Sequence, residues 1–414
     1  MTADTAIILA EKTAVNTDTD CLKFHEIYIQ PIGEILMKLL HLSDLHLGKR
    51  LHEYSMTEDQ EYILRRIIGI VDDEKPDGVM IAGDIYDKSV PTTEAVTLFD
   101  KFLSELCRRN VRVFCISGNH DSPERIAFGS RIMDNNGIYM SPVYDGKVEP
   151  IPLKDDYGEV NIYMLPFIKP IHVRHIFGDD KIVTYNDAVS RAVNEMDIDT
   201  DKRNILITHQ FVTGAVRTES EELSVGGTDN VDVSVFDKFD YVALGHLHAP
   251  QDCGKSTVRY CGTPLKYSFS EAQNKKSVTI VEISEKGNIS YRTTELVPLR
   301  DMKEIKGKYS EITRMDYYFG TTFQEDYLHI TLTDEQDIPE AAGRLRAIYH
   351  NLMKLDYDNR RTRTDNTVPA INNIEQKTPI ELFAEFYKLR NNNEMSEEQR
   401  KYAQKLIEEV WEED

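Results

Sequence analysis

The sequence predicts an α/β fold built on a mixed β-sheet, and three observations lead to this prediction. Five short apolar runs have the length of buried strands, and stretches with helical apolar spacing alternate with them. Later strands alternate apolar with polar residues and are joined by short turns, as in antiparallel sheets. Groups of carboxylate, imidazole and amide residues follow almost every apolar run. Because ligands bind beyond the carboxyl ends of strands in open α/β sheets, the pattern also predicts a site.

The predicted elements follow in chain order. The buried strands are Leu39–Leu42, Val79–Ala82, Val111–Ile116, Ile205–Thr208 and Tyr241–Leu244. Apolar residues at helical spacing predict helices over Thr57–Val71 and Pro91–Cys107. After Gly245 the alternating strands are Thr257–Cys261, Ser277–Ile283 and Ile289–Thr294. These elements together form a predicted α/β domain over residues 37–298.

A second, smaller unit follows, since 414 residues are too many for one ordinary core. Around residues 299–312 charge density rises and apolar runs stop, which indicates a boundary. Tyr327–Leu332 is a predicted strand and Pro339–Leu352 a predicted amphipathic helix, together a small α+β unit assigned to 299–365. The polar, aperiodic stretch from Asp356 to Lys377 predicts a long loop or linker, with 366–377 taken as the linker proper.

Two capped helices are predicted over residues 378–414. Thr378-Pro379-Ile380-Glu381 and Ser396-Glu397-Glu398-Gln399 are capping boxes, and the asparagine-rich stretch Arg390–Met395 between them predicts a turn. Both helices carry apolar stripes that must be buried somewhere. Packing against the α/β domain and binding a partner explain the stripes equally well.

The first 36 residues show no sustained periodicity before a strand begins abruptly at Met37. The codons for Gly33-Glu34 can spell a ribosome-binding site shortly before the Met37 codon. We therefore interpret residues 1–36 as either an upstream extension or a flexible leader.

Composition narrows the class of protein. The chain has 49 basic and 71 acidic residues, a formal charge of −22, which argues against gripping nucleic acid with the whole surface. It does not exclude a local basic groove. The five cysteines are scattered without a C-x-x-C pair, which fits a reducing cytoplasm. No stretch has the ~20 apolar residues of a membrane span, so no membrane is expected.

Five short signatures of metal-binding residues carry the chemistry. They are Asp44-Leu-His46, Gly83-Asp84-Ile-Tyr-Asp87, Gly118-Asn119-His120-Asp121, His209-Gln210 and Gly245-His246-Leu-His248. Alternate residues of an extended chain face one side roughly 7 Å apart, so His246 and His248 can each address a different ion of a pair. Imidazole and carboxylate ligands without a thiolate suit manganese, iron or zinc. Asp84 is the candidate for a carboxylate shared by both ions.

The signatures together predict a two-metal site for phosphoester cleavage. Two such ions supply a hydroxide nucleophile near neutral pH and stabilise negative charge on phosphorus. A proton for the leaving oxygen is still required, and His120 is free for this role once Asn119 serves as a ligand. Asp121 beside it is a candidate to tune or orient the imidazole.

Other polar residues near the signatures have more ordinary interpretations. We expect Asp87 to hydrogen-bond in a turn or behind a ligand rather than to bind metal. His41 lies inside the first strand and is predicted to be structural. Lys49, Arg50 and His52 lie in one loop and are candidates for contacts with a phosphate backbone, although a solvated loop is as good an explanation.

These motifs resemble the calcineurin-like metallophosphoesterase superfamily, and within it the DNA nuclease subunits that act under an ATPase. The resemblance covers about 37–298, including Met37-Lys-Leu-Leu-His-Leu-Ser-Asp-Leu-His-Leu-Gly48. The stretch Arg259-Tyr-Cys-Gly-Thr-Pro-Leu-Lys-Tyr-Ser-Phe-Ser-Glu271 is more specific to the nuclease branch. From residue 299 onward the resemblance is one of layout more than of residues.

The resemblance implies a sandwich of two mixed sheets flanked by helices, with two divalent ions, most often Mn²⁺. Asp44, His46, Asp84 and His248 would hold one ion, and Asp84, Asn119, His209 and His246 the other, with His120 as the catalytic acid. Some relatives have a histidine where this chain has Asp87. A cap domain at 299–365 would help to select DNA, and the C-terminal helices would dock on the ATPase. A homodimer within a heterotetramer is also implied.

Three functions follow from these observations. The first is a 3′→5′ exonuclease on double strands and endonuclease on single strands or hairpins, acting in DNA repair and recombination. The second is a phosphatase or cyclic-nucleotide phosphodiesterase with the same site, against which the domains after residue 299 argue. The third is a scaffold without activity, against which the complete set of ligand residues argues.

Overall fold

Two six-stranded β-sheets form the centre of the computed structural model, which describes residues 36–52, 54–218, 229–336, 338–359, 378–391 and 394–413. The first sheet contains, in spatial order, β16 Ile289–Glu295, β15 Ser277–Ile283, β1 Met37–Leu42, β4 Gly78–Ala82, β5 Arg112–Ile116 and β6 Ile138–Met140. The second contains β13 Gln251–Cys253, β14 Lys255–Tyr260, β12 Tyr241–Gly245, β9 Arg203–His209, β8 Gly158–Leu165 and β7 Ile151–Asp155.

Both sheets are mixed, as the sequence predicts. In the first sheet β1, β4, β5 and β6 are parallel, and β15 and β16 are antiparallel at one side. In the second sheet β14, β12, β9 and β8 are parallel, with β13 and β7 antiparallel at the two edges. The structure confirms the strands predicted over Ser277–Ile283 and Tyr241–Leu244, which correspond to β15 and β12.

The parallel strands have uninterrupted apolar sequences because they are buried on both faces. Leu39 and Met80 lie between the sheets, in one cluster with Ile205 of the second sheet. Their neighbours Leu40 and Val79 belong to the cluster on the outer face of the first sheet. The core therefore has three layers of apolar side chains, one between the sheets and one outside each sheet.

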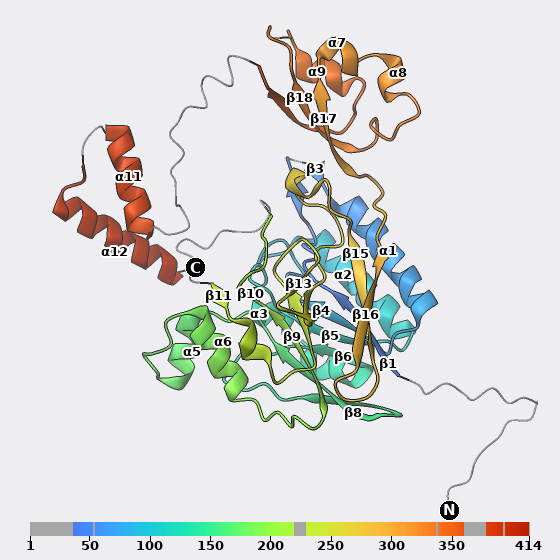
Figure 1. Cartoon of the computed structure of the whole chain (residues 1–414), viewed down its shortest axis with the longest axis vertical. Coiled ribbons are helices and arrows are strands. Elements are labelled where there is room, and N and C mark those ends of the chain that lie inside the picture. Colours follow the sequence, from blue (N-terminus) through green and yellow to red (C-terminus); the bar gives the residue numbers. More distant parts are fainter. Residues whose placement is uncertain are drawn as a thin grey trace, which may run out of the picture. The chain divides into compact units, whose positions relative to one another are not determined.

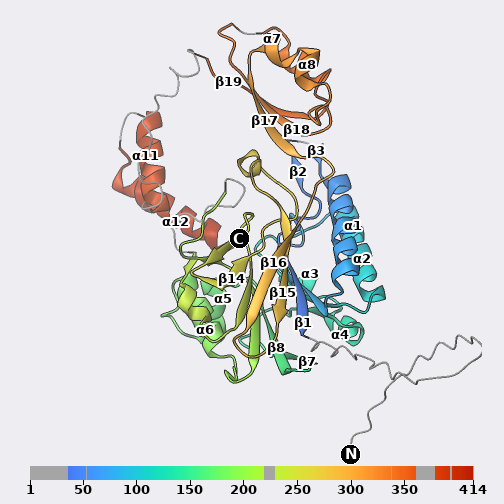
Figure 2. The ribbon, with the colours of Figure 1, turned by 45° about the vertical axis from the view of Figure 1, so that its right-hand side comes forward.

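Helices cover the two outer faces (Figures 1 and 2). The helices α1 Thr57–Glu74 and α2 Thr93–Arg108 pack on the first sheet, and α5 Pro170–Phe177 and α6 Tyr185–Asn194 on the second. The helices predicted over 57–71 and 91–107 are confirmed, and the second begins at Thr93 because the Thr92 side chain caps it by accepting from the Ala95 N–H at 3.3 Å. Shorter elements in this domain are β2 Arg50–Leu51, β3 Tyr54–Ser55, α3 Pro123–Ile126, α4 Ser130–Met133, β10 Phe211–Val212 and β11 Asn230–Val231.

The residues after 299 form a small α/β unit with its own core. Its parallel sheet has the order β17 Met302–Gly307, β18 Tyr327–Leu332 and β19 Leu352–Tyr357. The helices are α7 Tyr309–Ile312, α8 Met315–Tyr318 and α9 Ala341–Arg346. At the start of this unit, the buried carboxylate of Asp59 in α1 lies 2.8 Å from Arg300 Nη1 and accepts a hydrogen bond from the Tyr327 hydroxyl at 2.8 Å.

One prediction for this unit is wrong. The helix predicted over 339–352 ends at Arg346, and Leu352 already begins β19, which also takes in residues assigned to the polar loop. The segment 299–312, in which a domain boundary is predicted, contains the strand β17, which the sequence does not predict. In β17 the buried residues Met302 and Ile305 are three apart, so the strand lacks the alternation that identifies strands from sequence.

The C-terminal capping box at Ser396 has both of its hydrogen bonds, and the one at Thr378 has the bond from the Thr378 backbone to Glu381. The backbone N–H of Thr378 donates to Glu381 at 2.7 Å, at the start of α11 Pro379–Asn391. The backbone N–H of Ser396 donates to Gln399 at 2.9 Å, before α12 Glu397–Glu413. The predicted turn at 390–395 starts later than expected, because α11 continues to Asn391. The predictions for residues 1–36 and for the linker 366–377 fall outside the described residues, apart from Leu36.

None of the helices in the described ranges is long and apolar enough to cross a membrane.

Candidate metal centre

The predicted ligands all lie at the carboxyl ends of parallel strands. Asp44 and His46 follow β1, Asp84 follows β4, and Asn119 follows β5. From the second sheet, His209 ends β9, and His246 and His248 follow β12. The two sheets present these ends side by side, so seven residues from five separate segments converge.

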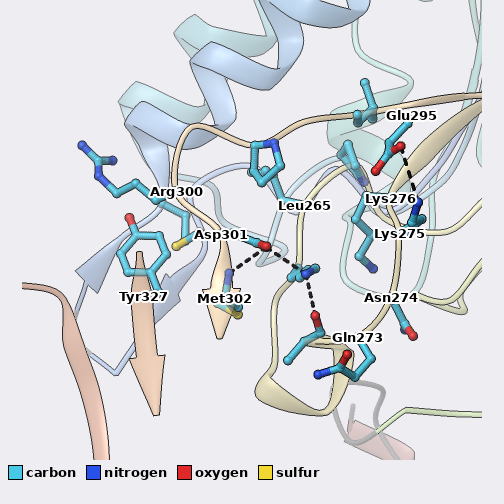
Figure 3. A pocket seen from close by; sticks show the side chains of 16 residues that line it. Leu265, Gln273, Asn274, Lys275, Lys276, Glu295, Arg300, Asp301, Met302 and Tyr327 are labelled. Atoms are coloured by element: carbon cyan, nitrogen blue, oxygen red, sulfur yellow. Dashed lines mark hydrogen bonds and ion pairs between the residues drawn. The ribbon is translucent and has the colours of Figure 1, made fainter. Parts of the chain in front are cut away.

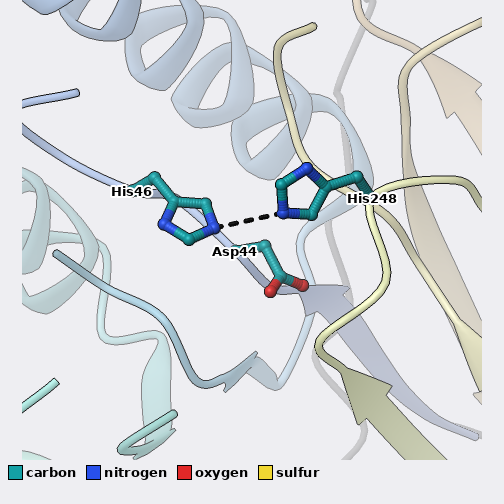
Figure 4. Close-up of side chains that lie close together, drawn as sticks. All are labelled: Asp44, His46 and His248. Carbon is teal, nitrogen blue, oxygen red and sulfur yellow. Dashed lines mark hydrogen bonds between the residues drawn. The ribbon is translucent and has the colours of Figure 1, made fainter. Parts of the chain in front are cut away.

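The first ligand group consists of Asp44, His46 and His248. One ligand atom from each lies within 4.8 Å of the others, and all three residues are buried. The Nε2 atoms of His46 and His248 face one another at 3.2 Å (Figure 4). Asp44 also links the two loops, because its carboxylate accepts a hydrogen bond from the His246 backbone N–H at 3.1 Å.

The second ligand group consists of Asn119, His209 and His246. The Asn119 Oδ1 atom lies 2.9 Å from His209 Nε2 and 3.0 Å from His246 Nδ1. Asp84 stands between the groups, with Oδ2 at 3.7 Å from His46 Nε2 and 3.4 Å from His209 Nε2. This is the position required of a carboxylate shared by two ions.

The backbone at the ligands is strained. Asp44, His46, Asp84 and His246 all have positive φ, of 54°, 44°, 49° and 103°. Non-glycine residues rarely adopt such values, and each costs on the order of 1–3 kcal/mol. Gly118 is required for a different reason, since a Cβ there would lie 2.1 Å from Asp84 Oδ1. The surrounding sheets hold these strained turns in place, which is typical of a functional site.

The electrostatics of the cluster favour a bound cation. Burial raises the pKa of Asp44 to about 6, although the neighbouring His209 opposes this shift. Burial lowers the pKa of His46 and of His246 well below the usual value, so both imidazoles are neutral, the form that binds metal. Burial also acts to lower the pKa of His209, but the charge of Asp84 raises it to about 9. Positive charge is thus stabilised beside Asp84.

The donor set therefore fits two divalent ions. Buried carboxylates and imidazoles that have mainly one another as partners are costly unless a cation joins them. Two carboxylates, four imidazoles and one amide oxygen are ligands for borderline divalent ions. Asp84 can belong to both coordination groups, as the sequence analysis expects.

His120 lies at the rim of the cluster. Its side chain is 25% exposed, its ring contacts that of His46 at 4.9 Å between centroids, and its Nε2 is 3.9 Å from Asp84 Oδ2. It is thus close to the ligands and accessible to a substrate. Asp121 is bound differently from what the sequence suggests, because its carboxylate accepts hydrogen bonds from the backbone N–H groups of Ile85, Tyr86 and Gly118. Asp121 ties the ligand loops together, and an effect on the His120 ring stays a prediction.

Asp87 pairs with a lysine. Its carboxylate accepts a hydrogen bond from Lys49 Nζ at 2.7 Å and lies 4.0 Å from His46 Nδ1, so it lies behind that ligand without a hydrogen bond to it. The pairing occupies Lys49, one of the three candidates for phosphate contacts. Arg50 is exposed, and His52 lies beside the Phe269 ring at 6.2 Å between centroids.

Sequence reasoning missed the residues that support the ligands. Gln60 in α1 accepts from the Gly48 N–H at 3.0 Å and donates to the His46 carbonyl at 2.7 Å, which anchors the first ligand loop. Glu271 is fully buried beside His248. Burial raises the pKa of Glu271, but the hydrogen bond with His248 and the charge of Lys276 lower it to about 2. Glu271 ends the second stretch on which the family resemblance rests, and that stretch was the available signal in the sequence.

His41 is predicted to be structural. Its ring forms hydrogen bonds with the Tyr241 hydroxyl at 3.1 Å and with the Leu244 carbonyl oxygen at 3.2 Å.

Comparison with known proteins agrees with this geometry. The calcineurin-like phosphoesterase family matches residues 37–250, more than half of the chain. The type 5 capsule protein repressor C-terminal domain, SbcD_C, matches residues 298–391. The SbcD subunit of the nuclease SbcCD from Staphylococcus epidermidis is 35% identical over 323 residues, which cover 77% of this chain and 85% of the relative. The chain belongs to the calcineurin-like phosphoesterases, in their SbcD branch.

Two solved structures resemble the chain more distantly. A dimetal phosphatase from Danio rerio is 11% identical, with a TM-score of 0.37. The match covers 63% of this chain and 96% of the phosphatase chain. A protein from Thermus thermophilus is 9% identical, with a TM-score of 0.35. This match covers 63% of this chain and 99% of the Thermus protein chain. The membership in the SbcD branch confirms the predicted two-sheet metallophosphoesterase fold and the class of metal-dependent phosphodiesterases.

Proposed function

We propose that this chain is the nuclease subunit of an SbcCD-type complex and hydrolyses DNA phosphodiesters with two divalent metal ions. The observation that carries the proposal is the convergence of seven candidate ligands, five of them buried and Asn119 and His246 partly exposed, in a chain that is 35% identical to an SbcCD nuclease subunit. Its action is 3′→5′ exonucleolytic on double strands and endonucleolytic on single strands or hairpins, within DNA repair and recombination.

The ligand residues would divide between two ions. Asp44, His46, Asp84 and His248 would hold the first, and Asp84, Asn119, His209 and His246 would hold the second. Manganese is the proposed metal because the family resemblance implies it; imidazole and carboxylate ligands without a thiolate are compatible with manganese, and equally with iron or zinc. When bound, such a pair supplies an activated water near neutral pH and stabilises the negative charge that develops on phosphorus.

His120 supplies the proton for the leaving oxygen. Its ring stands at the exposed rim, next to His46 and Asp84, where a scissile phosphate can reach it. Its backbone N–H donates to Asp84 Oδ1 at 2.9 Å, so the carboxylate shared by the ions also fixes the turn that carries His120. Proton transfer of this kind contributes about 10²–10⁴-fold to a rate.

The DNA path starts at the hairpin of β2 and β3, which directly follows the first ligand loop. Arg50 and His52 on this segment, and Lys49 just before it, are the proposed phosphate contacts, and Lys49 would have to leave Asp87 to reach a phosphate. With a formal charge of −22, the chain offers little further positive surface. The isolated protein should therefore bind DNA weakly and lose affinity steeply as salt rises.

The C-terminal helices are the proposed site for an SbcC-like ATPase. Phe386 is 54% exposed in α11 and Tyr402 is 66% exposed in α12. Apolar side chains this exposed on two capped helices are suited to burial against a partner helix. The proposed assembly is a cytoplasmic heterotetramer with two copies of this chain as a homodimer.

The proposal is tested with purified protein, manganese and end-labelled DNA, in the presence and absence of the ATPase. Cleavage of duplex ends from the 3′ side and of hairpins is expected, with none after chelation. The His120→Ala protein should bind manganese normally and cleave poorly. Rapid turnover of small phosphoesters with all DNA left intact would instead assign the site to a phosphatase or cyclic-nucleotide phosphodiesterase.

A further inference from the structure

One buried carboxylate near the metal centre has no part in the mechanism above. Glu271 ends the short helical turn η3 Phe269–Glu271 and is 0% exposed. A buried charge of this kind is stable only with a partner and several hydrogen bonds. Glu271 has both, since it forms an ion pair with Lys276 and accepts a hydrogen bond from the Tyr267 backbone N–H at 3.3 Å.

Lys276 is equally unusual, because a lysine is rarely buried. It is 4% exposed, and an ammonium group has three N–H donors. Three acceptors lie within hydrogen-bond distance of its Nζ: Glu271 Oε2, Thr263 Oγ1 at 2.6 Å and the carbonyl oxygen of His248 at 2.8 Å. Figure 3 shows Lys276 on the wall of a cavity of about 220 Å³, next to the exposed pair Lys275–Glu295.

The two buried residues hold opposite ends of His248. Glu271 Oε1 lies 3.4 Å from His248 Nδ1, and Lys276 holds the backbone carbonyl of the same residue. The other ring nitrogen, Nε2, points to His46 Nε2 at 3.2 Å, inside the first ligand group. A carboxylate accepts but cannot donate when ionised, so it places the proton on Nδ1 and leaves the Nε2 lone pair for a cation.

We propose that Glu271 is a positioning residue for the first metal ion, holding His248 as a carboxylate-backed ligand, while Lys276 balances the buried charge of Glu271. This inference rests on the proposed function insofar as it takes His248 to be a metal ligand. Glu271 touches neither the substrate nor the reacting atoms. It acts through the orientation and basicity of the His248 imidazole, and therefore on the affinity for one ion of the two.

Two double variants separate positioning from folding. Replacing a buried ion pair by apolar residues of similar volume is often neutral for stability, so Glu271→Leu with Lys276→Met should fold while it lacks the acceptor. Glu271→Gln with Lys276→Met keeps an acceptor oxygen at the same place. Glu295→Gln, at the exposed pair in Figure 3, is the matched control for loss of a nearby carboxylate.

The measurement is manganese binding by titration calorimetry on the full chain, with circular dichroism and thermal unfolding of the metal-free proteins as the check on folding. The Leu/Met variant should lose about 10–100-fold in affinity for one of the two ions and keep the other. The Gln/Met variant should recover most of this loss, and Glu295→Gln should match wild type.

Three outcomes overturn the inference: wild-type affinity for both ions in the Leu/Met variant, an equal loss at both ions, or no recovery in the Gln/Met variant. A wild-type chain that binds two ions but cleaves no DNA defeats the proposed function alone, and the affinity comparison still decides the role of Glu271. A wild-type chain that binds no manganese defeats both.

Discussion

The two ligand groups of the metal centre differ in burial and in what lies behind their imidazoles, since the first group is fully buried and Asn119 and His246 of the second are partly exposed. In the first group His248 Nδ1 lies 3.4 Å from Glu271, whereas His46 Nδ1 lies 4.0 Å from Asp87, too far for a hydrogen bond. In the second group His209 Nδ1 lies 2.8 Å from the carbonyl oxygen of Ala82. A carboxylate makes an imidazole more basic than a neutral carbonyl does. The difference indicates that the two ions bind with unequal affinity, the first more tightly.

The largest effect is expected from a substitution of the residue that the two groups share. In Asp84→Ala both ions lose a ligand, so both manganese-binding steps should weaken together and DNA cleavage should fall by about 10³-fold or more, the equivalent of ~4 kcal/mol of transition-state stabilisation. Calorimetry and initial cleavage rates measure the two effects. The exposed Asp72, paired with Arg109, provides the control Asp72→Asn. Loss of one step alone would mean that Asp84 does not bridge the groups.

The next largest effect is expected on the rate of DNA cleavage, with no change in manganese binding. His120→Ala removes the proposed proton donor but no proposed metal ligand, so cleavage should fall by about 10²–10⁴-fold. Both manganese-binding steps should keep their wild-type affinity. Single-turnover cleavage at saturating manganese is the decisive measurement. If the rate falls only because an ion is lost, and excess manganese restores it, then His120 is a ligand and not the acid.

The ligands could be predicted from the sequence, but the residues that support them could not. Asp44, Asn119 and His209 each follow a long apolar run, and the end of a buried parallel strand fixes where its next residues lie. Glu271 and Gln60 follow no such run. Their positions depend on how a turn and a helix pack against loops far away in the chain, which local patterns do not encode.

The small unit after residue 299 shows the same limit in its fold. Tyr327–Leu332 is recognisable as a strand because it is apolar and alternates, and its bounds agree with β18. The strands on either side of it, β17 and β19, are half-exposed and charged, and they pair with β18 in parallel. Parallel pairing at a distance leaves no turn signal between the strands, so the sheet became visible only in three dimensions.

The comparison of the two groups can be tested directly by removing one histidine from each. His248→Ala should abolish the tighter manganese-binding step and His209→Ala the weaker one. Each remaining step should still stabilise the protein, by about 2.7 kcal/mol when manganese is at 100 times its dissociation constant. Thermal unfolding over a manganese series measures this. If His209→Ala removes the tighter step instead, the carboxylate of Glu271 behind His248 does not control affinity.

The smallest expected effect concerns the side on which DNA approaches. Arg50 is exposed and lies on the hairpin after the first group. Arg217 lies on the side of the second group, where its Cζ is 3.7 Å from the centre of the Phe211 ring and its guanidinium pairs with Asp229. Only a cation that meets a phosphate releases counterions from DNA. Arg50→Ala should therefore lower the slope of log affinity against log salt by about 1, while Arg217→Ala, with the same change in charge, should leave it nearly unchanged. Fluorescence anisotropy with labelled duplex over a salt series measures both slopes. A reduced slope in Arg217→Ala alone would place the DNA path beside the second group, because the guanidinium would then have to leave Asp229 to reach a phosphate.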